Sequence, residues 1–148
     1  MNRAAAIQEL AAAFADMTIL RVVDPGADTL PHLVPAAFAM EHGTVLALAL
    51  NGLFREGIVI VEHEGDPIAM HAACGGSFFD AYGLNSRAEL IAGWADFYQE
   101  PVSNFTLRPS REDDSDTFEI DLEMGKQVSD LRDALLVRCA AAIAVLQR

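Results

Sequence analysis

The histidine and cysteine side chains that could bind a metal come together in one stretch, at His63, His71 and Cys74. Val/Ile-rich runs on either side of Gly65-Asp66 predict an antiparallel hairpin. In the register set by that turn, alternation places His63 and His71 on opposite faces of the sheet, and it separates His71 from Cys74 in the same way. Two ligands at most share a face, so we predict no metal site.

The same register places Glu62 and His71 diagonally on one face, where they could hydrogen-bond as an acid–base pair. A surface pair without catalysis explains the residues more simply, because perturbed pairs are common in sheets that have no active site. We therefore predict no catalytic residues.

The two cysteines do not have the surroundings of a reactive thiolate, which needs positive charge nearby. Cys74 lies in an apolar strand of an acidic chain and Cys139 on an apolar helix stripe, so both are predicted core thiols. Gly75-Gly76-Ser77 lacks the lysine and the spacing of a phosphate loop, and we predict no cofactor.

Seven acidic side chains and no basic ones occupy residues 112–123: Glu112, Asp113, Asp114, Asp116, Glu119, Asp121 and Glu123. Their spacing is not that of a calcium loop. They form either a solvated surface or an anionic patch that attracts a basic partner, and the two interpretations are compatible.

Large apolar side chains recur at helical spacing in one later segment, at Leu90, Trp94, Phe97 and Tyr98. They are either core or an interface, where Trp and Tyr are enriched. Because residues 134–146 are also apolar almost all round, we expect a second chain to cover one surface as a homodimer.

The elements of the first half begin with an amphipathic helix over 3–16. Residues 20–23 are β-like, residues 36–41 are a strand or one helical turn, and residues 44–50 are a strand followed by a hairpin at Asn51-Gly52. Strands over 57–63 and 68–74 complete a meander of three or four strands.

In the second half, Ser86 and Glu89 form a capping box that opens a helix ended by Pro101. Residues 102–107 could be a strand, and residues 117–123 alternate as a half-exposed strand. A long helix then extends to Leu146. The predicted fold is α+β, with an antiparallel sheet of about five strands and an N-terminal, a middle and a long C-terminal helix packed on it.

Composition indicates one acidic domain over 1–148, with 52% hydrophobic residues and a net charge of −12. Direct binding to a phosphate backbone needs a basic face and is not expected. Gln8 and Glu9 interrupt the apolar start that a secretory signal needs, and the longest apolar run is too short to cross a bilayer. We expect a cytoplasmic protein that does not bind membranes.

This order of elements in an acidic chain resembles the class I type III secretion chaperones. The resemblance is one of architecture and charge and spans nearly the whole chain, without a diagnostic motif. The matching stretches are 3–16, 44–74, 86–99, 118–122 and 129–146. Two segments depart from the family pattern, the proline-rich residues 24–35 and the long loop 75–85.

The resemblance implies a homodimer built around the middle helix, through Leu90, Trp94, Phe97 and Tyr98. It also implies that apolar patches on the first helix and the sheet hold an effector's N-terminal segment in extended form. The residues we assign to these patches are Ile7, Leu10, Phe14, Val59, Val61 and Met70.

Two alternatives remain open. The first is an acidic inhibitor, such as an immunity or anti-defence protein, whose acidic residues block a basic or nucleic-acid-binding surface. The second is a small enzyme that uses Glu62 and His71 as its acid–base pair.

Overall fold

The protein is described by a computed structural model that covers residues 1–148 and has an α+β fold. A five-stranded antiparallel sheet has the order β4-β3-β2-β1-β5. In chain order the elements are α1 (Arg3–Phe14), α2 (Met17–Val23), α3 (Val34–Glu41), α4 (Gly43–Phe54), β1 (Ile58–His63), β2 (Asp66–Cys74), β3 (Ser77–Asp80), β4 (Gly83–Asn85), α5 (Arg87–Tyr98), β5 (Phe105–Pro109), α6 (Asp114–Thr117), α7 (Leu122–Arg138) and α8 (Ala140–Leu146).

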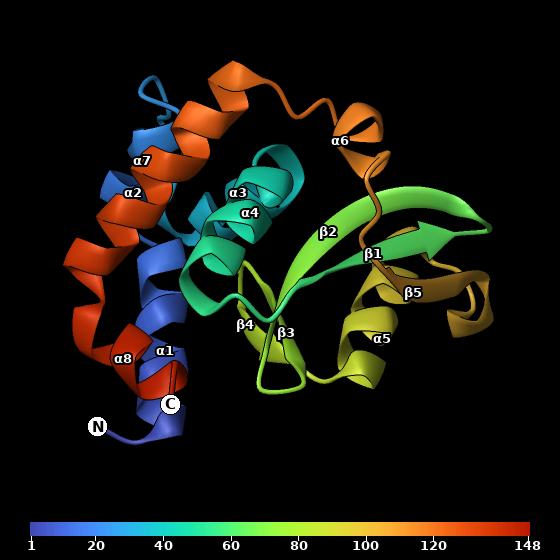
Figure 1. The fold of residues 1–148 in the computed structure, drawn as a ribbon, viewed down its shortest axis with the longest axis horizontal. Helices are drawn as coiled ribbons and strands as arrows, with labels where there is room; N and C mark the ends of the chain where they lie inside the picture. Colours follow the sequence, from blue (N-terminus) through green and yellow to red (C-terminus); the bar gives the residue numbers. More distant parts are fainter.

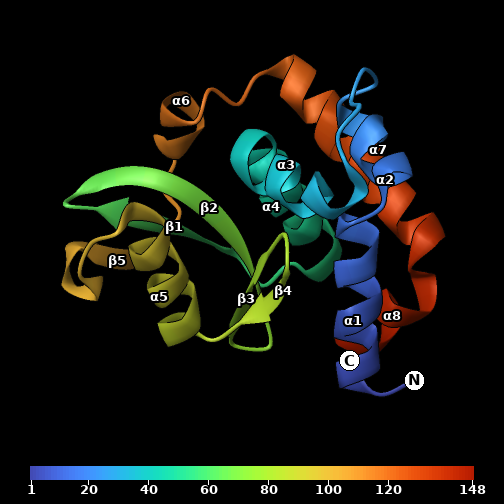
Figure 2. The same ribbon diagram turned by 180° about the vertical axis from the view of Figure 1, so that it is seen from behind.

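Helices α1–α4, α7 and α8 lie on one side of the molecule, and the sheet with α5 and α6 lies on the other side (Figure 1). Helix α1 packs on α8, and α2 and α4 pack on α7. The larger core, of 25 buried residues, lies among these helices and the ends of β2 and β3. The two ends of the chain lie near one another beside α1 and α8 (Figure 2).

Helices cover both faces of the central strands. Ile58, Ile60 and Met70 pack with Ala47 of α4 on one face. On the other face, Val61 packs with Leu90 of α5. The alternation along β1 and β2 therefore serves two cores, which explains why these strands are apolar on both sides.

The predicted fold class is confirmed, and so are the N-terminal helix, the β1–β2 hairpin and the Ser86 capping box. The Ser86 hydroxyl accepts from the Glu89 amide at 3.1 Å, and the Glu89 carboxylate accepts from the Ser86 amide at 2.8 Å. Residues 102–104 form a short 3-10 turn, and β5 begins at Phe105.

Three predicted strands are wrong, because the segments 20–23, 44–50 and 117–123 are not strands. Residues 20–23 belong to α2, and residues 44–50 belong to α4, in which Asn51 and Gly52 are helical instead of forming a hairpin. A short apolar run that is buried on several sides looks the same in a strand and a helix, and here its Leu and Ala content favours the helix. The run at 36–41, left open between a strand and a helical turn, belongs to α3.

The predicted strand at 117–123 is a turn, with Glu119 at φ 54°, followed by the start of α7. Phe118 and Ile120 still pack together against the Ile58 cluster, so their alternation reflects two inward contacts made by a turning chain. The long C-terminal helix is divided at Cys139 into α7 and α8. The predicted loop 75–85 contains the β3–β4 hairpin.

No single helix is long and apolar enough to cross a membrane. Only the bent pair Pro31–Glu41 and Gly43–Phe54, with an angle of 87° between its parts, meets the requirements of length and composition.

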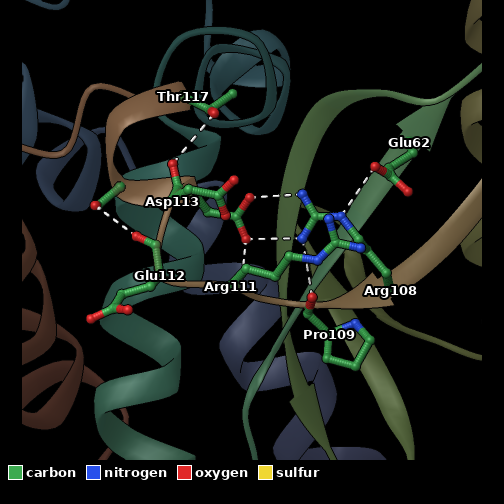
Figure 3. Close-up of polar contacts among 9 residues, drawn as sticks. Glu62, Arg108, Pro109, Arg111, Glu112, Asp113 and Thr117 are labelled. Carbon is green, nitrogen blue, oxygen red and sulfur yellow. Dashed lines mark hydrogen bonds and ion pairs between the residues drawn. The ribbon is translucent and has the colours of Figure 1, made fainter.

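A charged network fastens the acidic segment to the edge of the sheet. The Arg108 side chain, on β5, donates two hydrogen bonds to the Asp114 carboxylate at 2.7 and 3.0 Å, and its Nε lies 3.1 Å from Glu62 (Figure 3). The Asp114 carboxylate also accepts from the Arg111 amide at 2.6 Å. Asp114 is only 3% exposed, and the hydrogen bonds from Arg108 lower its pKa.

We expect Asp114→Ala to lower the free energy of unfolding by about 3 kcal/mol or more, because it leaves the Arg108 guanidinium buried without its main partner. The exposed neighbour Asp116 provides the control: Asp116→Ala should change stability by less than about 0.5 kcal/mol. Urea unfolding of both variants measures the difference. Equal effects would show that the Arg108 network does not stabilise the fold.

Candidate functional site

A groove of about 800 Å³ lies between the α3–α4 corner, β2 and α5. Of its 28 lining residues, 19 are hydrophobic. Its floor is the segment Ile68–His71 of β2, and one end is formed by residues 79–82, where β3 turns into β4. A groove of this size and lining is typical of a binding site.

The groove follows an unpaired edge of β2. On one side β2 pairs with β1 along most of its length, but on the other side it pairs with β3 only at Ala73 and Cys74. The Ala73 amide donates to the Gly57 carbonyl at 3.0 Å, on the β1 side. Because backbone groups alternate in direction along an antiparallel strand, the N–H and C=O of Met70 point away from β1, toward the groove. The edge thus offers backbone hydrogen bonds next to apolar walls.

The His71 side chain lies between β2 and β3, next to the point where their pairing ends. Its Nδ1 lies 2.7 Å from the Phe79 carbonyl, and Trp94 Nε1 lies 3.0 Å from its Nε2. A carbonyl only accepts and an indole N–H only donates, so the ring is neutral, with its proton on Nδ1. Burial lowers the pKa of His71, which favours the same neutral form. With both nitrogens bonded, His71 positions other groups and is not free to act as a base.

Exposed apolar side chains surround the opening of the groove. Met40 is 62% exposed, Tyr82 64% and Phe97 57%, and each lines the cavity. Tyr98 also lines it and contacts Trp94 and Phe97. Large apolar side chains gathered around a concave surface indicate a binding site, whereas isolated ones do not.

The walls of the groove also contain polar groups. Glu41, Asp80 and Glu89 line it, and no Lys or Arg does. Three buried side-chain polar atoms of the chain lack a hydrogen-bond partner, and two of them, His42 Nε2 and Asn85 Nδ2, belong to lining residues. Buried polar atoms are rarely left unpaired, so both atoms are available to a bound group.

The predicted Glu62–His71 pair does not form. Glu62 is paired with Arg108, while His71 bonds to Phe79 and Trp94. The observed register differs by one residue from the predicted one, with Val59 opposite His71, and a one-residue slip moves a side chain to the other face.

The same shift makes the predicted separation of the two histidines wrong. The His63 ring lies against the Tyr98 ring and His71 bonds to Trp94, so both point toward α5. His63 Nε2 lies 2.9 Å from Glu100, and this hydrogen bond raises the pKa of His63 and lowers that of Glu100.

Cys74 and Cys139 are buried core thiols, as predicted. Burial raises the pKa of both, so neither resembles an activated thiolate.

The residues assigned to partner binding are mostly core. Leu10, Phe14, Val61 and Met70 are buried, so their side chains cannot form a surface patch, and Ile7 and Val59 are half-buried. Of Met70, the backbone edge and not the side chain is presented to a partner.

The four residues assigned to a dimer interface divide into two pairs. Leu90 is buried against the sheet and Trp94 is held by His71, whereas Phe97 and Tyr98 are exposed. Among the acidic residues 112–123, Asp114 is buried in its ion pair, and the other six are exposed: Glu112, Asp113, Asp116, Glu119, Asp121 and Glu123.

Comparisons with protein-family models, curated proteins and solved structures find no match to this chain.

We expect His63 and His71 to change stability with pH in opposite directions. The lowered pKa of His71 gives stability that is present above the unfolded value, about 6.5, and is lost as the pH falls. The raised pKa of His63 gives stability that is present below about 6.5 and is lost as the pH rises through the folded value.

Urea unfolding between about pH 5 and pH 8.5 checks both directions. The stability lost in His71→Asn should be largest at the alkaline end, and the loss in His63→Gln largest at the acid end. Parallel pH profiles for the two variants would contradict the hydrogen bonds assigned to these rings.

Proposed function

We propose that this chain is a binding protein that takes up an extended segment of another polypeptide by adding it as a strand to the free edge of β2. One observation carries the proposal: Ile68–His71 lack a strand partner on the side where an apolar groove opens. Strand addition provides affinity through the backbone and specificity through alternate side chains.

The dimensions suit a short segment. The unpaired stretch Ile68–His71 has four residues, which at about 3.3 Å per residue corresponds to roughly 13 Å of strand. Side chains of an added strand would alternate between the α4 wall and the α5 wall, which carries Trp94. Asn85 Nδ2 is a free donor that suits a peptide carbonyl at the end of the groove.

The negative charge of the groove favours a segment with basic residues. The groove is lined by Glu41, Asp80 and Glu89 without a compensating base, and the chain carries a net charge of −12. We therefore propose an occupant with apolar residues at alternate positions and Lys or Arg near its ends, because an acidic segment would be repelled.

This activity agrees with what a secretion chaperone would do, and we retain that family as the proposed relationship. A homodimer through α5 is part of the same proposal. It would use the exposed Phe97 and Tyr98, which also border the groove, so dimerisation and segment binding would share one surface. The cytoplasm is the proposed location.

The exposed acidic residues of 112–123 favour a second candidate, an inhibitor of a basic surface. The Arg108–Asp114 pair anchors this segment, so the six remaining carboxylates are presented from a fixed backbone. Such an inhibitor would bind through charge, whereas the groove would bind mainly through apolar and backbone contacts.

The groove can be tested with synthetic peptides of eight residues that alternate Val or Leu with Lys. Trp94, the only tryptophan, lines the groove, so its fluorescence reports occupancy directly. We expect saturable binding, and loss of binding when alternate peptide amides are N-methylated, because the side chains stay but the strand hydrogen bonds cannot form. Equal binding of the methylated peptides would contradict strand addition.

Gly93→Gln should block the groove without unfolding the protein. Gly93 lies on α5 in the groove wall, and a Cβ added there meets nothing within 4 Å. Gly125 on α7 is equally open but lies outside the groove, so Gly125→Gln is the matched control. Both changes should stabilise the helix by about 0.5 kcal/mol. Only Gly93→Gln should weaken peptide binding, by tenfold or more; equal affinities would place the binding site elsewhere.

Salt dependence separates the two candidate functions. Complexes captured from the native cell should survive an increase from about 0.05 to 0.5 M NaCl if the groove binds the partner, because apolar contacts are not screened. Dissociation over the same range, together with loss of capture when Glu112, Asp113 and Asp116 are changed to Asn or Gln, would favour the inhibitor.

A further inference from the structure

Three side chains with metal-ligand chemistry meet at the corner between α3 and α4. Asp24 caps the C-terminus of α2, Glu41 is the last residue of α3, and His42 lies between α3 and α4. One ligand atom from each lies within 4.8 Å of the others. Glu41 and His42 also line the groove at its α3–α4 end, Asp24 does not, and none of the three belongs to the β2 edge.

Hydrogen bonds do not explain this arrangement. His42 Nε2 lies 3.6 Å from the Asp24 carboxylate and 3.8 Å from the Glu41 carboxylate, too far for a hydrogen bond to either. The atom is nevertheless buried and has no other partner, and the His42 side chain is only 16% exposed. A buried ring nitrogen without a partner destabilises the fold unless something else bonds to it.

We propose that Asp24, Glu41 and His42 bind one divalent transition-metal ion of the Zn²⁺ class. Ligand atoms about 2.0–2.1 Å from a tetrahedral zinc lie about 3.3 Å from one another, close to the two distances from His42. One imidazole with two carboxylates suits such an ion, whereas Ca²⁺ and Mg²⁺ prefer oxygen ligands alone. The ion also neutralises two carboxylates in a chain of net charge −12.

The backbone holds two of the three ligands in place. The His42 amide donates to the Phe38 carbonyl at 3.0 Å, which closes the last turn of α3. The Asp24 amide donates to Leu20, and its carbonyl accepts from Ala27 at 2.9 Å. Glu41, 67% exposed at its side chain, is the adjustable ligand and leaves the fourth position open to water. The ion would join the end of α2 to the α3–α4 corner.

A second cluster of possible metal ligands, His63, Glu64 and Glu100, differs because its side chains are already hydrogen-bonded. His63 and Glu100 are hydrogen-bonded at 2.9 Å, and Glu100 also accepts from Asn104 at 2.8 Å. A metal there would have to break bonds that are already made, so this cluster serves as an internal control.

Titration of the tag-free chain with Zn²⁺ by calorimetry, and with Co²⁺ by visible absorbance, tests the proposal. We expect one ion per chain and the visible absorbance bands of four-coordinate Co²⁺. Zn²⁺ should raise the Tm of the protein, whereas Ca²⁺ should not. The thiols of Cys74 and Cys139 are buried and should not compete.

The variants locate the ion. His42→Asn and Asp24→Asn should each weaken Zn²⁺ binding by about 100-fold or more, since even indirect neighbours of a metal contribute 10–100-fold. His63→Asn and the exposed His32→Asn should leave it unchanged. Absence of binding, binding that survives His42→Asn in a variant shown to be folded by circular dichroism, or binding lost in His63→Asn would each overturn the proposal.

Discussion

Strand β3 pairs with β2 at Ala73 and Cys74 and then turns away, and the side chain of His71 spans the space between them by bonding to the Phe79 carbonyl. The His71 side chain thus takes the place of the next backbone hydrogen bonds between β2 and β3. The substitution requires a neutral ring, which burial and the Trp94 indole both favour. Because the strands part at this point, Met70 keeps backbone groups without a strand partner, and the groove has a floor that can form hydrogen bonds.

An unpaired edge next to apolar walls invites unwanted pairing between copies of a protein, and this fold limits that in two ways. The edge lies at the bottom of a groove between α4 and α5, so a flat sheet from another copy cannot approach it. Acidic residues at the groove oppose the insertion of an equally acidic segment. A single extended segment with basic ends fits between the groove walls and is attracted by the acidic residues. It is therefore a better occupant of the edge than a second sheet.

The sequence predicted the parts of the fold that depend on local signals. The capping box at Ser86 and the hairpin at Gly65 carry their own turn chemistry, and both were found. The α4 segment was predicted as a strand because a run of Val, Leu and Ala is apolar in any conformation, and only its burial on several sides separates helix from strand. The register error at His71 arose because turn position alone leaves one residue of uncertainty, and one residue reverses every face.

The groove could not have been predicted in the same way, because its residues come from segments that no local pattern joins. Trp94 was identified from its spacing with Leu90, but its partner His71 was assigned to an acid–base pair with Glu62. Asn85 and Tyr82 fell in a segment predicted as a loop, where they carried no signal at all. These residues come together where β2 and β3 separate. The position of that separation depends on His71, whose side chain takes the place of the missing backbone hydrogen bonds. The chemistry of such a site becomes visible only when the hydrogen bonds of each strand are followed to the residue at which they stop.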